Sequence, residues 1–144
     1  MRENEETKYL NKLYQCAEMG TIGIDAVIEK VKQQSLQEVL ESQRKEYDNI
    51  CEEIVSILKK YGCEEEHLGK MAKKSSEMMC EVKTKIDDSD NQIAKMMMEG
   101  NNKGIIEVTK AKNEYEGEDS EIKNLMDHFI KVLEDNLAEM KKYL

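Results

Sequence analysis

The stretch over residues 93–111, IAKMMMEGNNKGIIEVTKA, most constrains what this chain can fold into. Apolar or small residues recur through it every three or four positions, which is the spacing of one face of an α-helix. They are Ile93, Met97, Gly100, Gly104, Val108 and Ala111. This spacing continues across the Gly-Asn-Asn-Lys-Gly segment, so it favours a helix over a phosphate-binding turn. The stretch therefore predicts a helix at the centre of a bundle.

The same three-and-four spacing predicts further helices along the chain. We expect helices at about residues 5–33, 35–61, 64–86, 89–115 and 119–143. Ser35 and Ser89 each begin a capping-box pattern, and Gly62 follows the second helix as a C-cap residue would. Proline is absent and every connector is short, which favours antiparallel packing. The sequence predicts one all-α domain over residues 1–144.

Charge and apolar patterning exclude several classes of protein. The formal net charge is -9, whereas a nucleic-acid-binding surface is basic, so we expect no nucleic-acid partner. The chain has no apolar run long enough to span a membrane, and its beginning lacks the apolar core of a signal peptide. We therefore expect no membrane partner and a cytoplasmic location. The four cysteines have no C-x-x-C spacing and are expected to be free thiols.

Three polar residues fall on predicted apolar faces: Gln43 and Tyr47 in the second helix, and Asn136 in the last. A buried amide needs hydrogen-bond partners, or it costs about 1–3 kcal/mol. These residues form either a polar layer that fixes helix register or a layer that holds a small ligand. Both interpretations stay open from the sequence.

Metal ligands are the next candidates, because helical bundles can hold di-iron centres. Such a centre needs two Glu-x-x-His motifs, and the sequence has only one, Glu64-x-x-His67, because Leu125 stands three residues before His128. A site made of carboxylates alone is the remaining option, and its candidates would be Glu18, Glu46, Glu107 and Glu134. The sequence also has no nucleophile or P-loop motif. We therefore predict no catalytic residue, no metal ligand and no cofactor.

Three glycines lie on the predicted apolar faces, namely Gly20, Gly100 and Gly104. Each costs roughly 1 kcal/mol relative to alanine inside a helix, so a packing gain should compensate. We expect close packing at these positions, with Gly100 and Gly104 approaching either the helix that carries Gly20 or a second subunit. The neighbouring methionines, Met96 to Met98, are expected to fill the core around that contact.

Two segments together resemble a family of small proteins from clostridia-type bacteria. They are YLNKLYQCAEMG followed by Leu40-x-x-Gln43-x-x-x-Tyr47, and IAKMMMEGNNKGIIEVTK with a C-terminal NLAEMKKYL. That family resembles the ferritin-like four-helix bundle, and a more distant likeness is to spore coat F type proteins. The resemblance implies an up-down bundle of two helix pairs joined by an extra crossover helix, for which residues 64–86 are suited. It transfers no activity, and spore association follows only from the distant likeness.

Three functions follow as hypotheses. The leading one is a non-catalytic structural or interaction protein that forms a homodimer. The second is a divergent metal-binding oxidoreductase of the ferritin-like class, using iron or manganese. The third is a small-ligand binder at the polar layer of Gln43, Tyr47 and Asn136.

Overall fold

The computed structural model describes residues 4–144, apart from the side chains of Met71 and Ser76. Within this range the chain is helical and contains no strand. The helices are α1 (Glu5–Val27), η1 (Ile28–Lys30, a 3-10 turn), α2 (Gln34–Lys60), α3 (Lys70–Ile86), α4 (Asp90–Glu114) and α5 (Ser120–Lys141). The all-α prediction is confirmed, and residues 1–3 of the predicted domain lie outside the described part.

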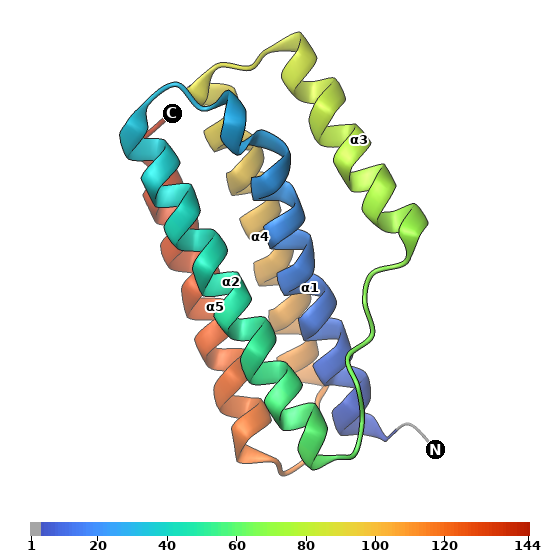
Figure 1. The fold of residues 1–144 in the computed structure, drawn as a ribbon. Helices are drawn as coiled ribbons and strands as arrows, with labels where there is room; N and C mark the ends of the chain where they lie inside the picture. The colour runs from blue at the N-terminus through green and yellow to red at the C-terminus, as the bar shows by residue number, and fades with distance from the viewer. Residues whose placement is uncertain (1–3) are drawn as a thin grey trace.

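Four of the helices lie side by side, and α3 stands apart from them next to α1 (Figure 1). α1 packs along α2, and α4 packs along α5, so that each pair is joined by a short connection. The segment that contains α3 crosses from the end of α2 to the start of α4. The molecule is therefore two helix pairs joined by a crossover.

The core lies between α1, α2, α4 and α5 and is built from the predicted apolar faces. α2 shows this most clearly, because the residues that recur along it every three or four positions are buried: Leu36, Leu40, Gln43, Tyr47, Ile50, Ile54 and Ile57. The largest fully buried side chains also come from these four helices: Phe129, Leu10, Leu13, Ile24, Leu36, Leu40, Ile50, Ile54, Ile57, Leu58, Ile93 and Ile122. Met96 is buried, and Met97 and Met98 pack against this core.

The turn between α1 and α2 differs from the prediction. α1 ends at Val27 rather than near residue 33, and α2 has Gln33 as its N-cap, so Ser35 lies inside the helix and caps nothing. The backbone N–H groups of Lys32 and Gln33 donate to the carboxylate of Asp90, each at 2.8 Å. This contact with α4 fixes residues 31–33 in a non-helical conformation. A local capping pattern does not contain this information.

The predicted helix over residues 64–86 begins only at Lys70. The preceding segment instead runs along α1, where the Asn11 side chain accepts from the backbone N–H of Glu66 at 2.9 Å. The Gln15 side chain donates to the backbone carbonyl of Glu66 at 3.2 Å. These two side chains satisfy the backbone that a helix would otherwise pair internally.

Local signals at other helix ends are confirmed. Ser89 caps α4 by accepting from the backbone N–H of Gln92, and Gly62 follows α2 with a φ of 71°. Asp119 caps α5 in the same way as Ser89 caps α4. In the described residues, no helix is long and apolar enough to cross a bilayer.

Candidate functional site

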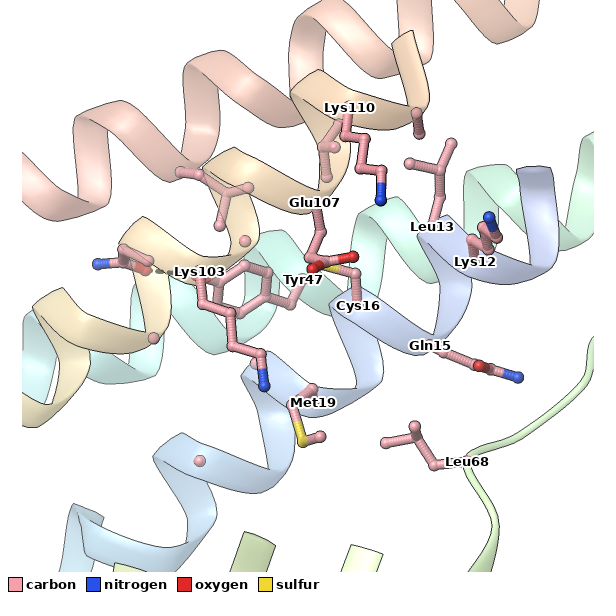
Figure 2. A pocket seen from close by; sticks show the side chains of 18 of the residues that line it. Lys12, Leu13, Gln15, Cys16, Met19, Tyr47, Leu68, Lys103, Glu107 and Lys110 are labelled. Carbon is pink, nitrogen blue, oxygen red and sulfur yellow. Dashed lines mark hydrogen bonds between the residues drawn. The ribbon is translucent and has the colours of Figure 1, made fainter. Parts of the chain in front are cut away.

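A groove of about 370 Å³ runs between α1 and α4, with residues of α2 and α5 at its floor. Its mouth is formed by exposed side chains such as Lys12, Lys103, Glu107 and Lys110, and Figure 2 shows three of them projecting from α4 opposite α1. Leu68, from the segment before α3, closes one side. The groove is therefore open to solvent and lined by all four bundle helices.

Four glycines line this groove: Gly20 and Gly23 of α1, and Gly100 and Gly104 of α4. A Cβ atom at Gly23 or Gly100 would meet nothing within 4 Å. The prediction of close packing is therefore wrong for Gly100 within this chain, because the space beside it is empty.

Gly20 and Gly104, in contrast, leave room for bulky side chains of neighbouring helices. A Cβ atom at Gly20 would lie 2.9 Å from the ring of Tyr47, which comes from α2. A Cβ atom at Gly104 would lie 3.0 Å from Leu133 of α5. Both are close contacts, but the neighbours are side chains of other helices rather than α1 against α4 as we expected.

A polar layer lies at the floor of the groove. Gln43, Tyr47 and Asn101 line the groove, and Asn136 lies beside Tyr47. Each of the four residues is 4% exposed. The Tyr47 hydroxyl donates to Asn101 Oδ1 at 3.0 Å and accepts from Asn136 Nδ2 at 3.4 Å. Tyr47 therefore links α2 to α4 and α5. Of the predicted polar residues, the structure brings Tyr47 and Asn136 into direct contact.

Asn101 is the member of this layer that the sequence analysis missed. It lies next to Gly100, and the predicted apolar face of the helix includes Gly100 in its place. The structure places Asn101 on the buried side and leaves Gly100 exposed. Asn101 lies four residues after Met97, so a step of four from Met97 would have included it in the predicted face.

Two nitrogens of this layer have no partner. Among the described residues, Gln43 Nε2 and Asn101 Nδ2 are buried and make no hydrogen bond. Both residues also line the groove. A buried donor without an acceptor costs about 1–3 kcal/mol. These two amides are therefore unused hydrogen-bond donors at the floor of an open groove.

The titratable groups of the floor are uncharged at neutral pH. Burial raises the pKa of the Tyr47 hydroxyl to about 12. Burial, together with the charge of Glu107, also raises the pKa of the Cys16 thiol to about 12. A protonated thiol is a poor nucleophile. The floor thus offers neutral hydrogen-bonding groups rather than an acid, a base or a nucleophile.

The carboxylates considered for a metal site lie apart. Glu18 contacts His67, with 3.2 Å between its Oε2 and the ring Nδ1. Glu107 lies at the mouth of the groove, and Glu134 is exposed on α5. In the described part of the chain, no group of three or more His, Cys, Asp or Glu side chains is arranged to hold a metal ion.

These features define an all-helical protein of two helix pairs, with a glycine-lined groove over a neutral polar floor. Comparison with known proteins gives the family. The chain belongs to the family described as a domain of unknown function (DUF2383), whose model matches residues 5–114. No curated protein matches the chain.

Two solved structures have a similar fold. One is the crystal structure of a conserved hypothetical protein, rv2844, from Mycobacterium tuberculosis, with a TM-score of 0.72 and 7% sequence identity over 100% of both chains. The other is "YcfI, a putative structural protein from Rhodopseudomonas palustris", with a TM-score of 0.60 and 18% identity over 98% of this chain and 90% of that one. At these identities the likeness concerns the fold alone.

Proposed function

We propose that this chain is a non-catalytic interaction protein of ferritin-like architecture that pairs with a second copy of itself through α3. The crossover between two helix pairs supports the ferritin-like assignment, and the name of the Rhodopseudomonas palustris neighbour is consistent with a structural role. The cytoplasmic location and the spore association remain predictions.

The apolar face of α3 carries this proposal. Met78, Met79, Val82 and Ile86 are between 53% and 83% exposed, on a helix that packs beside α1. Their spacing places them on one side of α3. A contiguous exposed apolar face on an otherwise polar protein marks an interaction surface.

The apolar face of α3 can pair with a second copy of itself. A two-fold axis perpendicular to α3 makes the two copies of the helix antiparallel. When the axis passes between Met79 and Val82, Met79 of one copy lies opposite Val82 of the other. The same apolar patch then covers itself, so a second copy has the matching chemistry.

Light scattering over a range of concentrations tests this pairing. We expect the native chain to approach the mass of a dimer as concentration rises, and the double variant Met79→Glu with Val82→Glu to stay a monomer. Ile106→Glu is the matched control, because Ile106 is 64% exposed but lies on α4. A native chain that stays monomeric, or a double variant that still dimerises, would refute the proposal.

A further inference from the structure

We propose that the groove between α1 and α4 binds an elongated apolar molecule with a polar end of hydrogen-bond acceptor oxygens, that is, a linear carboxylic acid. This inference goes beyond the proposed pairing, which uses a different surface. It rests on the shape of the groove and on the two unpartnered amides at its floor.

The shape indicates a single extended chain. The lining residues run along α1 from Lys12 to Ile24 and along α4 from Met97 to Glu114. At a rise of about 1.5 Å per residue, the α1 side is roughly 18 Å long. A volume of about 370 Å³ over that length gives a cross-section on the order of 20 Å². Such a section accommodates one extended hydrocarbon chain rather than a rounded molecule.

The walls are suited to that chain. Leu13, Ile24, Met97, Val108 and Leu133 line the groove, and apolar side chains of this kind bind hydrocarbon by removing it from water. Gly23 and Gly100 keep the groove open, since nothing stands within 4 Å of either missing side chain. Pockets of about 300–1,000 Å³ with apolar walls and a few polar groups are typical of small-molecule sites.

The unpartnered amides select the polar end. Asn101 Oδ1 already accepts from Tyr47, which leaves Asn101 Nδ2 as a donor with no acceptor. Gln43 Nε2 is the second such donor. Both nitrogens can only donate, so they match the oxygens of a carboxylate and would reject an ammonium group.

The charges around the groove agree with this selection. The floor is neutral, because burial raises the pKa of both Tyr47 and Cys16. The charged side chains lie among the lining residues nearer solvent: Lys12, Lys103, Lys110, Glu107 and Glu114. Three of these are lysines, so the nearby charge is compatible with an anionic end.

Calorimetric titration with dodecanoate below its micelle concentration tests the proposal. We expect saturable binding at one site per chain. Dodecyltrimethylammonium has the same chain with a cationic end, and we expect it to bind that site at least about tenfold more weakly, the effect of losing one or two hydrogen bonds. Absence of saturable dodecanoate binding, or equal one-site binding of the cation, would overturn the proposal.

Filling the groove locates the site. Gly23→Leu and Gly100→Leu each place a side chain in empty space, so these variants should fold and lose dodecanoate affinity by about tenfold or more. Asn102→Leu is the matched control, because Asn102 is exposed on α4 and does not line the groove. Native affinity in both glycine variants would show that the ligand binds elsewhere.

Two further measurements separate this site from α3 and need no substitution in the groove. The side-chain amide signals of Gln43 and Asn101 in the native chain should shift in ¹H–¹⁵N NMR spectra as dodecanoate is added. The α3 variant Met79→Glu with Val82→Glu should bind dodecanoate as the native chain does. Unmoved amide signals, or loss of binding in the α3 variant, would refute the groove as the site.

Discussion

Two pairs of glycines, one pair in α1 and one in α4, have opposite surroundings within a single helical turn. Gly20 and Gly104 face large side chains of neighbouring helices, Tyr47 and Leu133. Gly23 and Gly100 line the same groove but face empty space. The first two sites belong to the packed side of the bundle, and the other two belong to its open side.

This difference shows that a glycine in a helix does not by itself indicate close packing. At Gly20 the conformational cost of glycine is offset by the contact that Tyr47 makes in its place. At Gly100 no contact within the chain offsets the cost. Stability given up without compensation in the fold is common at sites that serve function. The following predictions test the packed side against the open side, in order of decreasing effect.

Removing the ring behind Tyr47 should have the largest effect on the packed side. Phe129 is fully buried, and its ring centre lies 6.5 Å from that of Tyr47. We expect Phe129→Ala to lower the free energy of unfolding by about 3–5 kcal/mol, because it leaves a cavity in the core. Urea denaturation measures this. A loss below about 1 kcal/mol would show that this side is not tightly packed.

A matched pair of substitutions in α1 compares the two sides directly. Gly20→Leu forces a side chain into the Tyr47 ring and should lower the free energy of unfolding by about 1–3 kcal/mol. Gly23→Leu enters open space and should not lower it. Denaturation midpoints of the two variants, read against the native chain, give the comparison. Equal losses would mean that the groove is closed in solution.

Asp90 joins α4 to the turn at the end of the packed α1–α2 pair. Burial raises its pKa, but the hydrogen bonds from the backbone of Lys32 and Gln33 outweigh burial and leave the pKa below the ordinary 3.8. We expect Asp90→Ala to cost about 1–2 kcal/mol at neutral pH through the loss of these bonds.

The depressed pKa also sets the pH dependence of this contribution. A carboxyl whose pKa is lower in the folded state stabilises the fold above pH 3.8, and that stability is lost as pH falls through the folded value. Denaturation curves of Asp90→Ala and the native chain should therefore converge in acid. Asp88→Ala is the control, because Asp88 is exposed. A difference that stays constant into acid would contradict the role of the carboxylate.

On the open side, Gly100→Ala should stabilise the protein. Its Cβ atom meets nothing within 4 Å, and alanine is favoured over glycine inside a helix by about 0.5–1 kcal/mol. The shift of the thermal midpoint measures this gain. A decrease in stability would mean that another surface, such as a second subunit, approaches α4 at this point.

The smallest loss of stability is expected at the unpartnered amide of Gln43. Gln43→Met keeps the length of the side chain and removes a buried donor that has no acceptor, so the free energy of unfolding should not fall. Tyr47→Phe is the contrasting variant and should cost about 1 kcal/mol, because its hydroxyl makes two hydrogen bonds. Equal losses in the two variants would mean that Gln43 has a partner in solution.

The periodicity of the sequence predicted where most of the helices lie, and it failed where distant residues decide. α2 follows its apolar spacing closely, because that spacing alone determines which side of the helix can be buried. The segment before α3 has acidic residues suited to a helix N-terminus, yet this segment is not helical, and Asn11 and Gln15 of α1 bind its backbone instead. That competition involves residues about fifty positions apart, which no local pattern contains.

By itself, the sequence determined the all-helical class, the apolar faces and the burial of Gln43, Tyr47 and Asn136, because helix periodicity fixes which side chains share a face. Only the tertiary structure decided that Asn101 joins them and that Gly100 faces a groove. The rotation of α4 about its axis depends on how Tyr47 and Leu133 fill the neighbouring spaces. Gly100 and Asn101 are adjacent in α4, so a rotation of the helix by one residue position would exchange the empty site and the buried amide. The packing of the other helices sets this rotation.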